Sequence, residues 1–151
     1  MVNKDYGNIL VPFDDSKFAQ KALDVAKTLA KSFDSTLHIV TVVDISSVVS
    51  PGMIRSKERK AWEQIRLSIR QSAKKAVQQK ENQCALEKVR TKAWVVEGSA
   101  VNEILKIIRQ NEIDLVVIGS KGLSGLSKMK ALGSVSRKIS ELSDCPVMII
   151  H

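Results

Sequence analysis

Short apolar runs alternate along the chain with longer segments of helical periodicity. Residues 8–13 form an apolar run without polar alternation, which is typical of a strand buried on both faces of a parallel sheet. Residues 36–44 are rich in β-branched side chains and 114–119 form the most apolar run, so both predict strands. Residues 87–98 alternate in part and predict a strand nearer a sheet edge, while 146–151 predict the last strand.

Apolar residues with helical spacing fill the intervals between these runs. Ser16 can cap a helix that reaches about Phe33, and Ser99 can cap another. Residues 57–82 predict a long basic helix and 134–142 a short final one. The predicted buried stripe of the basic helix comprises Trp62, Ile65, Ile69, Ala73 and Ala76 or Val77.

The chain thus alternates strand and helix five times. This pattern predicts an α/β fold, in which a doubly wound five-stranded parallel sheet carries helices on both faces. The length of 151 residues suits a single domain spanning 1–151. A content of 44% hydrophobic and 26% charged residues is ordinary for a globular protein.

Composition and the first residues also indicate the cellular setting. No run of about 18 uncharged apolar residues is present, so we expect no transmembrane helix and no membrane partner. The N-terminus lacks the basic start, long apolar segment and cleavage site of a signal peptide, so we expect a cytoplasmic protein. Cys84 and Cys145 have neither a C-x-x-C pattern nor metal-ligand spacing, and we interpret them as unpaired thiols.

The formal net charge of +8 favours an anionic partner, such as a nucleotide, a nucleic acid or a membrane surface. Residues 57–82 hold eight Lys and Arg against three Glu, and 121–138 hold five cations and no acid. Two interpretations of the first segment stay open: the solvated face of an amphipathic helix, or a surface for nucleic acid. Aromatic residues make up 4% of the chain, so a base-stacking platform is not evident.

The most unusual stretch is DLVVIGSKGLSGLSKMKALGSVSRKI, from Asp114 to Ile139. A glycine-rich loop begins at Gly119, where a strand should end, and Gly133-Ser134 begin the final predicted helix. Glycine lets a ligand approach the backbone closely and tolerates positive φ. A helix N-terminus presents free N–H groups that favour a phosphate. A flexible loop that ends in a glycine helix cap would explain the same residues without any ligand.

Polar residues at other predicted strand ends indicate where such a ligand would lie. Open parallel sheets bind ligands outside the carboxyl ends of the strands, where the strand order reverses. Asp14 follows the first strand, 42–44 close the second and Gly119 ends the fourth, so these positions converge if the order is 3-2-1-4-5. Because a carboxylate only accepts hydrogen bonds, Asp14 suits ribose hydroxyls or an adenine edge. Together with Asp15 and Asp44 it can also hold Mg²⁺ beside a nucleotide, although an aspartate in the position of Asp15 is more often just part of the turn into a helix.

Familiar catalytic patterns are missing from the sequence. There is no G-x-x-x-x-G-K-[ST] loop and no G-x-G-x-x-G after the first strand. Neither His38, in mid-strand, nor His151 has an evident nucleophile and orienting carboxylate beside it. No ligand cluster indicates a metal site. We therefore expect no catalytic residue, and at most weak ATP hydrolysis, since no water-positioning residue or arginine finger is evident.

Five segments together carry a family resemblance. They are ILVPFDDSKFAQKALDVAKTLA near the start, LHIVTVVD, DLVVIGSKGLSGL, LGSVSRKI and, at the end, CPVMII. In these segments, and over essentially the whole chain, the sequence resembles the universal stress proteins of the UspA type. The resemblance implies the adenine nucleotide alpha hydrolase-like fold with strand order 3-2-1-4-5, and a homodimer joined through the last strand, 146–151. Independently, the apolar stretch VMIIH after Pro146 would form an exposed edge that invites pairing with a second chain.

Part of that family binds ATP through a pattern G-x2-G-x9-G-[ST]. Gly119-x2-Gly122 and Gly133-Ser134 match its two halves, but ten residues separate them, from Leu123 to Leu132, one more than the pattern allows. The full set of binding residues that the resemblance implies comprises Pro12, Asp14, Val42, Gly119, Lys121, Gly122, Gly133, Ser134, Val135 and Ser136.

Each member of this set has an implied role. Asp14 would contact ribose or adenine, and the backbone of Val42 would meet the adenine edge. Gly119, Lys121 and Gly122 would line the ribose and phosphates. Residues 133–136 would hold phosphate oxygens. If the loop bulges outward, it absorbs the extra residue at little cost; if the insertion shifts Gly133, the phosphate site is lost.

Three functions remain after these observations. The favoured one is a universal stress protein-like domain that binds ATP, with or without Mg²⁺, and acts as a stress sensor or regulator. The second is a dimeric scaffold that binds no nucleotide and acts through partners, which a collapsed pocket would favour. The third is a protein that binds nucleic acid or another acidic surface through the basic helix, which salt-dependent oligonucleotide binding would favour.

Overall fold

The structure, a computed structural model, describes residues 5–47, 52, 57–123 and 132–151. Its elements in chain order are β1 (Asn8–Pro12), α1 (Lys17–Phe33), β2 (Thr36–Val43), the 3-10 helix η1 (Ile45–Ser47), α3 (Arg59–Leu86), β3 (Thr91–Glu97), α4 (Ala100–Gln110), β4 (Leu115–Gly119), α5 (Ser134–Leu142) and β5 (Val147–Ile150). All five predicted strands and the four predicted helices are present, with bounds shifted by a few residues.

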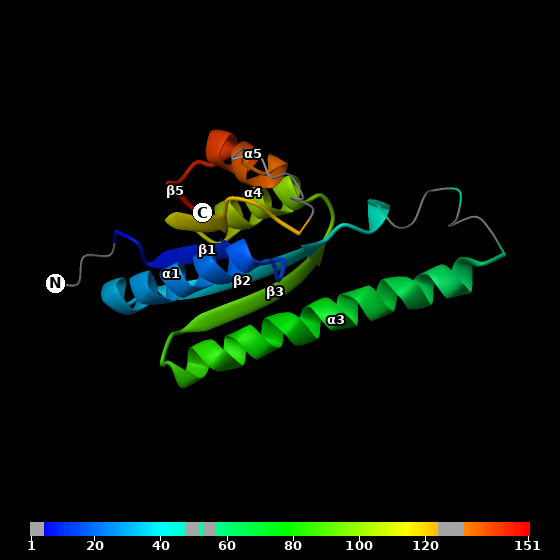
Figure 1. The fold of residues 1–151 in the computed structure, drawn as a ribbon, viewed down its shortest axis with the longest axis horizontal. Coiled ribbons are helices and arrows are strands. Elements are labelled where there is room, and N and C mark those ends of the chain that lie inside the picture. The colour runs from blue at the N-terminus through cyan, green and yellow to red at the C-terminus, as the bar shows by residue number, and fades with distance from the viewer. Residues whose placement is uncertain (1–4, 48–51, 53–56, 124–131) are drawn as a thin grey trace.

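The strands form one parallel sheet in the order β3-β2-β1-β4-β5, which confirms the predicted topology (Figure 1). β1 lies between β2 and β4, so the strand order reverses beside β1. β3 and β5 form the two edges, as the partial alternation of residues 87–98 predicted for β3. The carboxyl ends of β1, β2 and β4 therefore lie side by side, and a parallel sheet binds ligands at such a point.

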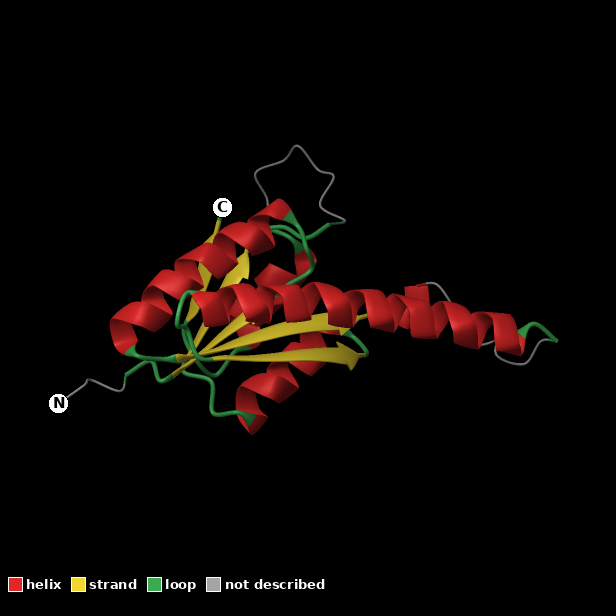
Figure 2. Cartoon of the chain, turned by 90° about the horizontal axis from the view of Figure 1, so that it is seen from below, coloured by secondary structure: helices red, strands yellow, loops and turns green. Residues whose placement is uncertain are grey.

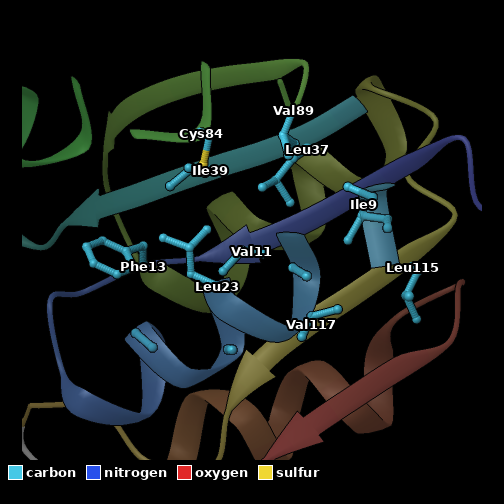
Figure 3. Close-up of a cluster of buried hydrophobic side chains, with 14 residues drawn as sticks. Ile9, Val11, Phe13, Leu23, Leu37, Ile39, Cys84, Val89, Leu115 and Val117 are labelled. Carbon is cyan, nitrogen blue, oxygen red and sulfur yellow. The ribbon is translucent and has the colours of Figure 1, made fainter. Parts of the chain in front are cut away.

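Helices cover both faces of the sheet. α1 and the C-terminal part of α3 pack on one face, around the buried cluster of Figure 3. α4 and α5 pack on the other face, around Leu10, Val40, Val116 and Ile139. Because each central strand contributes side chains to both clusters, β1 and β4 are apolar at nearly every position. This burial explains why their sequences show no polar alternation.

Local sequence accounts for the course of α1. The Ser16 side chain accepts a hydrogen bond from the Ala19 N–H at 3.1 Å, which confirms the predicted N-cap. The helix ends where Asp34 adopts a left-handed conformation and its N–H bonds to the Ala30 carbonyl. Small buried residues on the inner side of α1, among them Ala22, bring the helix close to β4.

The basic helix α3 extends beyond the sheet that it covers (Figure 2). Val77 and Cys84 are buried, but Ile65 is 40% exposed and Trp62 only partly buried. The prediction of a buried stripe is therefore wrong for the N-terminal half of the helix. The reason is length: 28 residues of helix span about 42 Å, whereas the eight residues of β2 span roughly 26 Å. Even this helix is too polar to cross a membrane, and no other described helix is long and apolar enough.

The histidine in β2 is a buried neutral side chain. His38 is 2% exposed, and its Nε2 lies 2.9 Å from the Asn8 Oδ1, while its Nδ1 is buried without a hydrogen-bond partner. Burial, with a smaller contribution from the charge of Lys92, lowers the pKa of His38 to about 4. A protonated ring would place an N–H in apolar surroundings with no acceptor.

Stability should therefore fall in mild acid through His38. Its pKa is about 4 in the folded state against 6.5 for an unperturbed histidine, so the unfolded chain binds more protons in this interval. The free energy of unfolding should drop by about 2 kcal/mol between about pH 7.5 and pH 5 through this residue. His38→Gln keeps an N–H donor for Asn8 but cannot titrate. Urea unfolding of both proteins at the two pH values measures the difference; identical pH dependence in the two would contradict it.

Candidate functional site

A cavity of about 310 Å³ lies at the carboxyl ends of β1, β2 and β4. Its lining comprises Pro12, Phe13, Asp14, Ala19, Val40, Val42, Ala100, Ile104, Ile118, Gly119, Lys121, Gly122, Gly133, Ser134, Val135 and Ser136. All ten residues that the sequence singled out as a binding set belong to this lining. Positions more than 120 residues apart in the chain thus meet in one cavity.

One side of the cavity consists of an apolar wall and, next to it, the backbone N–H and C=O of Val42. Side chains of Val40, Ile104 and Ile118 form the apolar wall. The Phe13 N–H donates to the Val40 carbonyl at 2.7 Å, so the polar backbone groups of Val40 point toward β1. In a parallel strand the same orientation recurs two residues on. The N–H and C=O of Val42 therefore also point to the β1 side, where β1 has already ended.

The opposite side of the cavity is the N-terminus of α5. The first backbone bond of this helix is from the Arg137 N–H to the Gly133 carbonyl, at 3.0 Å. The N–H groups of Ser134, Val135 and Ser136 consequently have no acceptor within the helix. No side chain caps this end. Three N–H donors and the positive end of the helix dipole are available here to an anion.

The base of the glycine loop is closed by hydrogen bonds. The Gly133 N–H donates to the Ser120 carbonyl at 2.7 Å. The buried Ser136 hydroxyl lies 3.0 Å from the same carbonyl and 3.0 Å from that of Gly133, to which it can donate. Gly133 therefore lies beside the end of β4. Residues 124–131, most of the ten-residue spacer, lie outside the described residues. Ser136 belongs to the residues expected to hold phosphate oxygens, but its hydroxyl is here engaged at the base of the loop.

Two glycines of the site are required by close contacts rather than by unusual dihedral angles. Among the described glycines, positive φ occurs at Gly98 and at none of the predicted site positions, so these positions do not use the freedom of glycine to adopt it. A Cβ on Gly119 would lie 2.8 Å from the Phe18 carbonyl carbon and 3.0 Å from the Ala19 nitrogen, both backbone atoms of α1. A Cβ on Gly122 would lie 2.7 Å from the Asp14 Oδ2.

The Asp14 side chain is held by backbone donors from two segments. Its Oδ1 accepts from the Ser16 N–H at 3.1 Å and its Oδ2 from the Leu123 N–H at 3.0 Å. The described part of the chain contains no group of three or more metal-ligating side chains, so the alternative of a Mg²⁺ cluster made by Asp14, Asp15 and Asp44 is not realised.

The expected basic character of the site is only partly within the described residues. Lys121 lines the cavity, and Arg137 and Lys138 are exposed on α5. Lys128 and Lys130 lie outside the described residues.

The sequence analysis missed the contribution of α4. Ala100 and Ile104, in the first two turns of this helix, line the cavity. The predicted N-cap, Ser99, is in place but its side chain makes no capping hydrogen bond. A strand end followed at once by a helix cap was the available signal, because helix starts gather at this edge of a parallel sheet.

The chain is similar to known proteins over nearly its whole length. The sequence model of the Universal stress protein family matches residues 5–151. Universal stress protein YxiE of Bacillus subtilis is 34% identical over 97% of this chain and 99% of its own length. The universal stress protein UspA from Lactobacillus plantarum superposes with a TM-score of 0.85 at 28% identity, over 99% of this chain and 100% of that one. A universal stress protein from Archaeoglobus fulgidus, solved in complex with dAMP, has a TM-score of 0.67 at 17% identity and covers both chains fully. The chain belongs to the universal stress protein family.

Proposed function

We propose that the protein binds ATP in this cavity and acts as a nucleotide-dependent sensor or regulator in the stress response. The observation that carries the proposal is the pairing of two unsatisfied backbone sets across one cavity. The backbone N–H and C=O of Val42 lie on one side of the cavity, and the three free N–H groups at the start of α5 lie on the other. The dAMP complex of the Archaeoglobus fulgidus structure supports an adenine nucleotide as the ligand class.

The chemistry of each part suits one part of ATP. An N–H and a C=O side by side, as at Val42, match the acceptor and donor on the adenine edge, and the apolar wall suits the flat ring. Asp14 uses two of its roughly four lone-pair sites for backbone donors, which leaves two for ribose hydroxyls. Gly119, Lys121 and Gly122 would follow the ribose and the first phosphates. The N–H groups of residues 134–136 would bind phosphate oxygens, and Mg²⁺ would then enter with the phosphates rather than through a protein cluster.

A binding role fits the site better than a catalytic one. No side chain of the cavity lining is a histidine or cysteine, and the pKa of His38 is too low for a general base near neutral pH. ATP would therefore act as a signal rather than as a substrate. The cytoplasmic location expected from the sequence remains a prediction.

Calorimetric titration with ATP and with GTP, each with and without Mg²⁺, tests the proposal. Guanine presents a donor and an acceptor in the reverse order along the same edge, so it would set N–H against the Val42 N–H. We expect ATP to bind at least about fivefold more tightly than GTP, because an unmatched buried polar group costs roughly 1–3 kcal/mol. Absence of ATP binding by folded, nucleotide-free protein would reject the proposal. Equal affinity for GTP would reject the role of Val42.

We also propose that the protein forms a homodimer through β5. The Pro146 carbonyl accepts a bond from Val116 of β4, and the Ile150 carbonyl accepts one from Ser120, which follows β4 directly. The backbone groups of Val147 and Ile149 therefore point away from β4, to the open edge. Met148 is 37% exposed on this strand, and no charged residue interrupts it. An unprotected apolar edge of this kind favours pairing with an identical strand.

Ile149→Pro should convert the dimer to a monomer. The substitution deletes an outward N–H while leaving the bonds to β4 intact, so the intermolecular ladder alone loses a donor. Sedimentation equilibrium measures the mass, and circular dichroism confirms the fold. Met148→Lys provides a second disruption of the same edge, and Leu142→Lys, at an exposed position on α5, serves as the control. Dimers that persist in both β5 variants would exclude this interface.

The two alternative functions have weaker support. A scaffold without ligand was expected to show a collapsed pocket, and a cavity is present instead. Aromatic platforms on α3 would favour a surface for single-stranded nucleic acid, but Trp62, the aromatic residue of this helix, is partly buried. Two arginines of α3, Arg66 and Arg70, pair with Glu97, which reduces the positive charge available to phosphates.

A further inference from the structure

Asp14 joins three segments at the mouth of the cavity. The residue follows β1, its Oδ1 holds the backbone of Ser16 before α1, and its Oδ2 holds the backbone of Leu123 in the glycine loop, 109 positions away. A carboxylate that accepts two backbone N–H groups forms charge-assisted hydrogen bonds, which are stronger than neutral ones. The contact therefore fastens the loop to the sheet without any ligand.

This fastening works together with the one at the loop base. Ser120 is held through its carbonyl by the Gly133 N–H at 2.7 Å, and Leu123 is held by Asp14. Lys121 and Gly122 thus lie between two fixed points, and both line the cavity. Gly122 leaves room for this contact between Asp14 and Leu123. A Cβ at position 122 would lie 2.7 Å from the Asp14 Oδ2.

We propose that Asp14 is a positioning residue, which holds the segment 121–123 in its phosphate-binding geometry before the ligand arrives. This inference rests on the proposed nucleotide site and extends it. Asp14 would then strengthen the binding of the phosphates even when no ribose is present for it to contact. A preformed loop raises affinity because the ligand need not order the loop itself.

Removal of the Asp14 carboxylate should change the affinity for a bare polyphosphate in one direction if Asp14 holds the loop, and not in that direction if it only contacts ribose. A negative charge close to the phosphates repels them. A carboxylate that does not also hold the loop would therefore weaken the binding of a bare polyphosphate. Removing such a carboxylate would leave the affinity for inorganic tripolyphosphate unchanged or raise it. If Asp14 holds the loop, the same removal lowers that affinity.

The experiment compares wild type, Asp14→Ala and Gly122→Ala by calorimetry with ATP and with inorganic tripolyphosphate. Asp15→Asn is the matched control: it removes the neighbouring charge, at a position with φ of 64° that asparagine tolerates. The rate of hydrogen exchange of the Leu123 amide, measured by NMR without ligand, reports on its hydrogen bond to Asp14. We expect Asp14→Ala to weaken tripolyphosphate binding by about tenfold and to speed Leu123 exchange by a similar factor. Gly122→Ala should act in the same direction, and Asp15→Asn should change neither.

Unchanged or tighter tripolyphosphate binding by Asp14→Ala would overturn the inference. If wild type binds neither ATP nor tripolyphosphate measurably, the proposed function fails, and the exchange experiment alone decides whether Asp14 holds the loop. Leu123 exchange that is equal in wild type and Asp14→Ala would then refute the fastening, and faster exchange in the variant would support it.

Discussion

Ser134→Pro is expected to weaken ATP binding by roughly 10- to 150-fold while the protein stays folded. Ser134 is the first residue of α5, and its N–H has no acceptor within the helix. Proline is well tolerated at this first helical position, because the missing N–H removes no helical bond. Gly133 already has the extended conformation, φ −62° and ψ 158°, that a following proline requires. A lost hydrogen bond to a charged phosphate costs about 1.5–3 kcal/mol, which gives the stated range.

Ser134→Ala is the matched control for this variant. It removes the hydroxyl but keeps the backbone N–H, so it separates the two donors that Ser134 offers. We expect a smaller loss with alanine than with proline when both are measured by calorimetry. Urea unfolding of the two variants verifies that α5 is retained. If Ser134→Pro binds ATP as tightly as wild type, the phosphates do not lie at the N-terminus of α5.

Gly119→Ala is expected to destabilise the fold by about 3 kcal/mol, at the upper end of the usual cost of overpacking. The added Cβ would lie 2.8 Å from the Phe18 carbonyl carbon and 2.9 Å from its Cβ. A clash with helix backbone cannot be relieved by a change of rotamer, so α1 must move away from β4, against which it packs closely. The shift in the urea midpoint relative to wild type measures the effect.

Gly133→Ala provides the comparison at a second site glycine. Its Cβ would lie 3.3 Å from the Ser120 carbonyl oxygen and at least 3.5 Å from other atoms, so the contact is tight but not severe. Because alanine is a poor N-cap, we expect a loss of at most about 1 kcal/mol. Equal stability losses in the two variants would show that contact with α1 is not what requires glycine at 119.

The atoms around the three glycines differ, so glycine suits each position for a different steric reason. Gly119 allows a strand and a helix to approach, Gly122 leaves room for the Asp14 carboxylate, and Gly133 ends the loop at a helix start. From the sequence, Gly119 and Gly122 were interpreted as sites of close ligand approach, and Gly133 as the start of a helix. The difference became visible only when the atoms around each Cα were placed, because a steric requirement depends on neighbours that are distant in the chain.

The sequence by itself determined the fold class and the order of the elements. Apolar runs such as 8–13 lack alternation because a central parallel strand buries both faces, and that property is local. Helix starts at Ser16 and Ser134 followed from capping and helix-end chemistry, which involves residues only three or four positions apart. The resemblance to universal stress proteins then supplied the strand order and ten of the sixteen residues that line the cavity.

Tertiary structure decided what depends on distance in space. It alone showed that Gly133 lies beside Ser120, that α3 extends beyond the sheet, and that α4 contributes to the cavity wall. It also showed that Asp14 holds Leu123, and that the Ser136 hydroxyl is already engaged. Periodicity records which face of an element is buried but not how far its neighbour extends. Hydrogen bonds between residues more than a hundred positions apart leave no local pattern in the sequence.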